Sequence, residues 1–180
     1  TTEIYTTHYL TGQVTKSNFK TGEVSILAEG NESQSGWGLY IDLTHNQLLA
    51  CMNAPVSEIG PFFSGGPSPT SAARVLSFDL TTGAQVVEWN LGGGIIGNAV
   101  TADNAGNIYV SDLIGGGVDK IDRSTNEVEQ WVEFVLPFLG GCVFDGESAI
   151  YVHGGFPNSS LVKIGINEDG SAATPETINL

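Results

Sequence analysis

The sequence predicts an all-β protein built from consecutive four-stranded antiparallel sheets, and three observations lead to this prediction. A sequence block returns at a fixed spacing, because Val75 to Val118 and Val118 to Leu161 are each 43 residues. A turn recurs at the same place in each repeat. Helix-period patterns and capping boxes before apolar runs are absent. A period in the low forties made of short strands is typical of one blade of a β-propeller.

Each repeat contains two strand-like blocks in which apolar and polar residues alternate. The first block occurs at residues 3–8, 107–112 and 149–153, and the second at residues 13–18, 74–79, 117–122 and 161–164. Alternation over four to eight residues indicates a strand with one buried face. A single blade cannot bury both faces of its sheet, so the blades are expected to pack around a common channel.

The turn between the third and fourth strands supports this register independently. It occurs at residues 20–22, 81–83, 124–126 and 168–170, and it ends on Gly22, Gly83, Asn126 and Gly170. These residue types tolerate positive φ, which a tight hairpin requires. The third blade is the clearest, with strands expected at residues 98–103, from 107, from 117 and at 127–134.

We therefore expect one β-propeller domain over residues 1–180. It divides into a partial blade at 1–30 and three fuller blades at 36–90, 97–134 and 139–180. The first blade has no innermost strand, which leaves fifteen strands and an open edge. The chain is then a fragment of a six-bladed ring of about 260 residues, half of a ring completed by a second chain, or a four-bladed ring closed by an irregular terminus. Because it begins at Thr1, a leader was removed or the chain was cut from a longer one.

Residues 54–73 interrupt the period of the second blade. This insertion contains four prolines and the pair Phe62-Phe63. The proline and glycine content predicts neither strand nor helix, and two adjacent aromatic side chains are costly to leave in water. The segment is either a lid or partner contact, or a tolerated insertion.

The net charge of −14 comes from 20 acidic and six basic residues. Such a surface repels phosphate backbones and anionic lipids, so neither nucleic acid nor a membrane is expected as a partner. No apolar run approaches the roughly 18 residues that cross a bilayer. The acidity itself serves solubility or attracts cations and basic partners.

Two Asn-x-Ser triplets, at Asn31 and Asn158, are potential glycosylation sites and favour a secreted, extracellular protein. Cys51 and Cys142 fall in strands of different blades. A disulfide needs Cα atoms within about 7 Å, so both are expected to be unbridged thiols that fill space in the interior.

The candidate site lies on the face where the insertion, both Asn-x-Ser triplets and the starts of the inner strands gather. A ligand there is expected to contact inner-strand starts under the Phe62-Phe63 loop. Trp37, between two glycines, offers a ring that stacks on a sugar or packs in the core. The candidate ligand-binding residues are Trp37, Asn98, Phe62, Phe63, His153 and Asp112. The sequence has no zinc-ligand spacing and no Gly-x-Ser-x-Gly elbow.

Residues 97–112, Gly-Asn-Ala-Val-Thr-Ala-Asp-Asn-Ala-Gly-Asn-Ile-Tyr-Val-Ser-Asp, resemble a blade of the gluconolactonase and regucalcin-like propellers and of NHL-repeat proteins. The resemblance implies a six-bladed propeller. In the lactonase branch it implies a divalent cation such as Ca²⁺, held by Glu, Asn and Asp of inner strands, which polarises a lactone. Asn98 matches a ligand of that family, and the alternative is that it satisfies backbone groups at the channel mouth. The corresponding Trp37 and Gly140 do not match.

The leading functional prediction is an extracellular binding or scaffold module that holds a small molecule, a glycan or a protein at this face. The first alternative is a cation-dependent hydrolase of a lactone or ester, with Asn98 as one ligand of the metal. The second is a structural unit that forms homo-oligomers through open blade edges.

Overall fold

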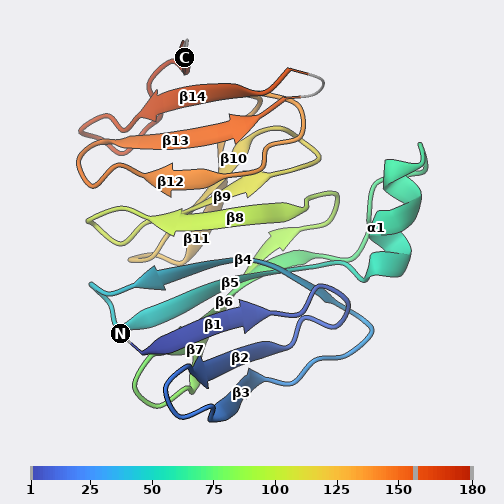
Figure 1. The fold of residues 1–180 in the computed structure, drawn as a ribbon. Coiled ribbons are helices and arrows are strands. Elements are labelled where there is room, and N and C mark those ends of the chain that lie inside the picture. The colour runs from blue at the N-terminus through green and yellow to red at the C-terminus, as the bar shows by residue number, and fades with distance from the viewer. Residues whose placement is uncertain (1, 156–157, 179–180) are drawn as a thin grey trace. The chain divides into compact units, whose positions relative to one another are not determined.

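The computed structural model describes residues 2–155 and 158–178 (Figure 1). These residues form antiparallel sheets and one short helix, grouped in two compact units at residues 1–94 and 95–180. Within the described ranges, no helix has the length and apolar character needed to cross a membrane.

The first unit contains a three-stranded and a four-stranded sheet. The three-stranded sheet has the order β1 (Glu3–Thr7), β2 (Val14–Asn18), β3 (Val24–Ala28). The four-stranded sheet has the order β4 (Ser35–Asp42), β5 (Gln47–Asn53), β6 (Ala73–Asp79), β7 (Gln85–Gly92). The helix α1 (Val56–Phe63) lies between β5 and β6.

The second unit contains two four-stranded sheets, each formed by strands that are consecutive along the chain. Their strands are β8 (Gly97–Ala102), β9 (Ile108–Asp112), β10 (Val118–Asp122) and β11 (Glu127–Val132), then β12 (Cys142–Phe144), β13 (Ala149–Gly154), β14 (Ser160–Gly165) and β15 (Glu176–Ile178).

The prediction of repeated antiparallel four-stranded sheets is confirmed, and the described residues form fifteen strands. The first sheet consists of three strands, as the sequence predicts. The shared Ile-Tyr pairs at residues 4–5, 108–109 and 150–151 place β1 in the same position as β9 and β13. In β9 and β13 that position is the second strand of the sheet, so β1 is a second strand without a first.

The predicted turns are confirmed at the level of the backbone. Gly22, Gly83, Asn126 and Gly170 have φ values of 76°, 75°, 62° and 80°. In the first three sheets, an Asn or Asp four residues earlier accepts backbone N–H bonds from the turn, as Asp79 Oδ1 does from Thr81 (3.0 Å) and Thr82 (2.7 Å). Asn18 and Asp122 do the same. These turns are therefore held by a side chain as well as by the φ of one residue.

The insertion at residues 54–73 contains a helix, so the prediction that proline and glycine exclude one was wrong. Pro55 stands at the N-cap of α1 with φ of −62°, where its missing N–H removes no helical hydrogen bond. Glu58 accepts hydrogen bonds from the backbone N–H groups of Thr70 (2.9 Å) and Ser71 (3.0 Å), which ties the helix to the returning chain. Ile59, a residue of the helix, is fully buried.

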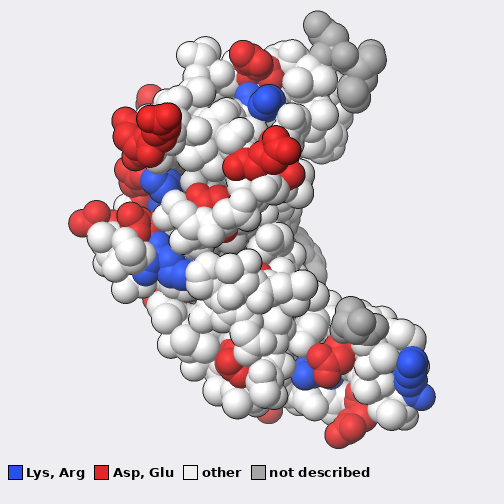
Figure 2. Space-filling model, turned by 90° about the vertical axis from the view of Figure 1, so that its left-hand side faces the viewer, with Lys and Arg blue, Asp and Glu red and all other residues white. Residues whose placement is uncertain are grey.

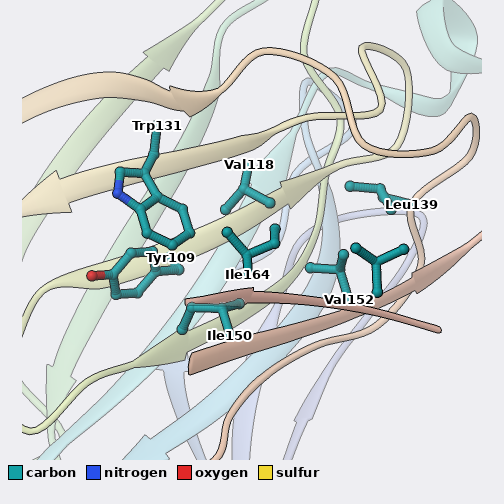
Figure 3. Close-up of a cluster of buried hydrophobic side chains, with 8 residues drawn as sticks. Tyr109, Val118, Trp131, Leu139, Ile150, Val152 and Ile164 are labelled. Carbon is teal, nitrogen blue, oxygen red and sulfur yellow. The ribbon is translucent and has the colours of Figure 1, made fainter. Parts of the chain in front are cut away.

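The core of the second unit fills the space between its two sheets (Figure 3). It consists of Tyr109, Val118, Trp131, Leu139, Ile150, Val152, Val162 and Ile164. The ring of Tyr109 meets that of Trp131 edge to face, with centroids 4.8 Å apart. A second cluster, which includes Val14, Leu48 and Phe78, joins the two sheets of the first unit in the same way. Apolar burial between neighbouring sheets thus stabilises each unit.

Tyr109 and Tyr5 occupy equivalent positions in unequal surroundings. The Tyr109 ring is fully buried, and its hydroxyl donates to Asp103 Oδ2 at 3.0 Å. Tyr5 is only half-buried, and its hydroxyl donates to the half-buried Glu3. We expect Tyr109→Phe to lower the free energy of unfolding by about 1 kcal/mol, because it removes the hydrogen bond made by a fully buried tyrosine. Tyr5→Phe is the matched control, and it should lower the free energy of unfolding by well under half as much. Urea denaturation measures both, and equal losses would contradict the comparison.

Candidate functional site

Trp37, one of the predicted site residues, lies near the start of β4. Its indole N–H donates to Ser35 Oγ at 3.0 Å, and the Ser35 hydroxyl donates to the carbonyl of Ala54 at 2.7 Å. Its own carbonyl accepts a hydrogen bond from the Thr7 hydroxyl at 2.7 Å. Ring and backbone are therefore both held, while the side chain stays only half-buried.

Tyr9 packs edge to face on Trp37, with ring centroids 5.4 Å apart and an interplanar angle of 62°. Tyr9 and its neighbour Leu10 form the tip of the loop between β1 and β2, and they are 44% and 56% exposed. We call these three residues, Tyr9, Leu10 and Trp37, the aromatic platform. Sequence analysis missed Tyr9 and Leu10. Their position in the repeat could have indicated them, because the loop between β1 and β2 corresponds to the loop between β5 and β6, which contains Phe62 and Phe63.

Two glycines let the loop approach β4 closely enough for these rings to meet. A Cβ on Gly36 would lie 2.8 Å from Thr7 Cβ and 3.2 Å from the Cα of Gly12. Gly12 itself has φ of +64° and donates its N–H to the carbonyl of His8 at 2.7 Å. The loop is thus a closed turn pressed onto β4, and the platform is formed before any ligand arrives.

Phe62 and Phe63 contact each other at the end of α1, with centroids 5.5 Å apart. Phe63 is 52% exposed, and no ring contact joins either residue to the platform among the described residues. Figure 1 shows α1 beyond the end of β5. The structure therefore places the phenylalanine pair and Trp37 in the same unit but in separate clusters.

In the second unit, Asn98 and His153 both lie close to Gly140. A Cβ on Gly140 would be 3.6 Å from His153 Nδ1 and 3.9 Å from Asn98 Nδ2. The Asn98 amide donates to the carbonyl of Leu139 at 3.1 Å, which joins the start of β8 to the segment before β12. Asn98 thus satisfies a backbone group, one of the two roles that sequence analysis considered.

The donors around Asn98 do not fit a hard divalent cation. A Ca²⁺ site uses six to eight oxygen ligands, several of them carboxylates. Asn98 directs its amide nitrogen to Leu139, and Gly140 offers no side chain. The described residues contain no group of three His, Cys, Asp or Glu side chains able to hold a metal. We therefore derive no metal-dependent step.

Asp112, another candidate, lies at the end of β9 and is 5% exposed. Its carboxylate accepts backbone N–H bonds from Ile96 (3.1 Å), Ile114 (2.9 Å) and Gly115 (2.9 Å). Burial raises the pKa of Asp112, and the three N–H donors oppose that shift. This arrangement holds the loop between β9 and β10 and gives Asp112 a structural role.

The two potential glycosylation sites lie at the surface, whereas the cysteines are wholly or partly buried. Asn31 and Asn158 are both exposed, and Asn31 Oδ1 accepts a hydrogen bond from the Ser33 N–H at 2.9 Å. Cys51 is buried and Cys142 half-buried, and no disulfide joins them. Figure 2 shows one face of the molecule, on which acidic side chains outnumber basic ones. A surface hollow of about 480 Å³ is lined by Asp122, Glu127, Val128 and Glu129, none of which is a candidate residue.

Comparison with solved structures identifies the fold. The major allergen Mala s 1 of Malassezia sympodialis is similar with a TM-score of 0.72 at 19% identity, over 95% of this chain and 58% of that one. Virginiamycin B lyase of Staphylococcus aureus is similar with a TM-score of 0.67 at 12% identity, over 99% of this chain and 53% of that one. A chain of a nidogen/laminin complex is similar with a TM-score of 0.63 at 14% identity, over 94% and 59%.

These similarities and the repeated sheets define the chain as a β-propeller protein, as the sequence predicts. The chain spans between half and two thirds of the length of these three propellers. No protein-family model matches the sequence, and no curated protein matches it as a relative. At such low identity the likeness concerns the fold alone, so function is argued from the site.

Proposed function

We propose that the chain is an extracellular β-propeller binding module whose aromatic platform holds a flat, weakly polar ligand. The observation that carries the proposal is the half-exposed Tyr9–Trp37 pair, in which hydrogen bonds with Ser35 and Thr7 hold Trp37 and Tyr9 packs against its ring. Rigid aromatic faces at a surface stack on sugar rings and similar groups at little entropic cost. A glycan is the ligand class that this arrangement favours.

Charge supports a neutral or cationic ligand over an anionic one. The chain has a formal net charge of −14, and an anion would approach it against that field. The extracellular assignment is supported by the exposed Asn31 and Asn158, each in an Asn-x-Ser triplet. Protein partners are a second kind of ligand for the same face, because similar propellers occur in the nidogen/laminin and mitotic checkpoint complexes.

Tryptophan fluorescence offers a direct test. Trp89 and Trp131 are only 4% and 8% exposed, so changes on ligand addition report mainly on Trp37. Titration with a panel of neutral oligosaccharides should shift the emission in a saturable way. Because Trp37→Ala removes the reporting indole, its affinity is measured by calorimetry; it should bind about tenfold more weakly or worse, the loss of roughly 1.4 kcal/mol expected for one stacked ring.

Phe63→Ala is the matched control, since it removes an exposed aromatic ring of the same unit away from the platform. It should leave the titration unchanged. Equal weakening by both substitutions, or an affinity of Trp37→Ala that equals that of the wild type by calorimetry, would count against the platform as the site.

A further inference from the structure

The loop of the aromatic platform is bonded to the loop between β3 and β4. The Asn31 N–H donates to the carbonyl of Thr11 at 2.8 Å. Beside it, a Cβ on Gly30 would lie 2.8 Å from Thr11 Cβ and 2.9 Å from Gln13 Cβ, so the missing side chain allows this close approach. The two loops are therefore in direct contact, and the backbone of Asn31 has a fixed position beside the platform.

Asn31 is also close to Tyr9 in space. The turn that carries Tyr9 is closed by hydrogen bonds from the N–H groups of Thr11 (3.3 Å) and Gly12 (2.7 Å) to the carbonyl of His8. Consecutive Cα atoms are about 3.8 Å apart and those of hydrogen-bonded pairs about 5.5 Å, so the Cα atoms of Tyr9 and Asn31 lie within roughly 14 Å. An oligosaccharide attached to Asn31 is bulky enough to cover that distance.

The side chain of Asn31 presents the atom to which a glycan is attached. Asn31 is exposed, and its Oδ1 accepts hydrogen bonds from the N–H (2.9 Å) and the hydroxyl of Ser33, the third residue of the Asn-x-Ser triplet. Its Nδ2 has no hydrogen-bond partner within residues 2–155 and 158–178. N-linked glycans are carried on this nitrogen, so the acceptor atom is accessible in the folded protein.

A sugar tethered at this position competes well for the platform. A ligand held by a short flexible connection has an effective concentration of about 1 mM. A free sugar must therefore approach that concentration, or bind more tightly, to displace the tethered one. The net charge of −14 does not oppose the contact, because a neutral glycan feels no repulsion from it.

We propose that an N-linked oligosaccharide on Asn31 folds back onto Tyr9 and Trp37 and competes with external ligands for the aromatic platform. This inference rests on the proposed function, because it takes the platform to be a sugar-binding surface. The modification forms a bond between Asn31 Nδ2 and the anomeric carbon of an oligosaccharide carried on a lipid diphosphate. The carbon–oxygen bond of the donor breaks, the diphosphate leaves with the bonding electrons, and the amide nitrogen loses one proton.

Quenching of tryptophan fluorescence by acrylamide tests the contact without any added ligand. Trp89 and Trp131 are 4% and 8% exposed, so acrylamide reaches mainly Trp37. The protein is produced in a secretory host, and mass spectrometry establishes whether Asn31 carries a glycan. Asn31→Gln cannot carry one and should raise the quenching constant at least twofold, because nothing then covers the indole.

Three further variants separate the glycan from changes in the loop itself. Ser33→Ala destroys the acceptor triplet but keeps Asn31, and it should match Asn31→Gln. Ser33→Thr keeps a functional triplet and should match wild type. Asn158→Gln removes the acceptor of the second unit and is the matched control, so it should leave the quenching of Trp37 unchanged.

Calorimetry measures the competition between tethered and free sugar. The probe is the oligosaccharide released enzymatically from Asn158→Gln, in which Asn31 is the acceptor of the one remaining Asn-x-Ser triplet. It should bind Asn31→Gln with one-to-one stoichiometry. The glycosylated wild type should bind it at least fivefold more weakly, because its own glycan already occupies the platform.

The absence of sugar on Asn31 in the secreted protein would overturn the inference. Equal quenching constants and equal affinities for wild type and Asn31→Gln would also overturn it, and binding of the released oligosaccharide to both would then leave the proposed function intact. If the oligosaccharide fails to bind Asn31→Gln at millimolar concentration, the platform is not a sugar site, and the proposed function fails together with this inference.

Discussion

Replacing Asp119 by Asn is expected to stabilise the protein at pH 8 by about 4 kcal/mol and to remove much of its pH dependence between pH 4 and 8. Asp119 lies on β10 and is 6% exposed. Burial, and secondarily the negative charge of Asp112, raise its pKa to about 7. The charged form is therefore disfavoured in the folded state.

The sign of the effect follows from proton binding. Between the unfolded pKa of 3.8 and the folded pKa of about 7, the folded state holds a proton that the unfolded state has released. The free energy of unfolding therefore falls as the pH rises through this window, by about 1.4 kcal/mol for each unit of pKa shift. Asn cannot ionise, so wild type and Asp119→Asn should converge near pH 4 and diverge above it.

Urea denaturation from pH 4 to 8 measures this difference. Asp122→Asn, on the same strand, is the control, because the hydrogen bond from Ser124 lowers the pKa of Asp122 and its substitution should stabilise nothing. Parallel pH profiles for wild type and Asp119→Asn would show that Asp119 titrates at its ordinary pKa and refute the expectation.

Asp112→Ala is expected to lower the free energy of unfolding by about 3 kcal/mol, because it strips three backbone N–H groups of their acceptor. Asp112→Asn keeps the oxygen that accepts from Ile96 and Ile114 and loses only the one that accepts from Gly115. The free energy of unfolding should therefore fall by about half as much. The measurement belongs at pH 6, where Asp119 is mainly protonated and repulsion between the two carboxylates is small.

The Asp112 variants also decide between a ligand-binding and a structural role. A structural carboxylate predicts loss of stability for Ala, with partial retention for Asn. A ligand-binding role predicts instead that both variants unfold at the same urea concentration as wild type but bind ligand more weakly. Denaturation midpoints of both variants that match wild type would restore Asp112 as a binding residue.

The fold could be predicted because its signals are local and repeated. The 43-residue spacing repeats a whole sheet, and the positive-φ positions Gly22, Gly83, Asn126 and Gly170 are properties of single hairpins; the structure has these positions where they were expected. The helix α1 escaped prediction because its stability depends on Glu58 reaching Thr70 and Ser71, a contact twelve or more residues away. Proline content alone carried no information about that contact.

The candidate site was only partly predictable. Trp37 was identified from its glycine neighbours, yet its partner Tyr9 lies 28 positions earlier, and only the close approach at Gly36 brings the two rings together. Asp112 and Asn98 had polar side chains at plausible positions. The structure uses both to satisfy backbone groups.

The amino-acid sequence by itself determined that this protein repeats an antiparallel sheet, where each sheet turns, and that the first sheet begins with its second strand. Those features follow from alternation and turn chemistry, which act over a few residues. Only the tertiary structure decided which side chains are exposed at the surface and which are used in contacts within the protein. That outcome depends on packing between strands distant in sequence, as with Tyr5, which is half-buried, and its counterpart Tyr109, which is fully buried in the core between the two sheets of the second unit.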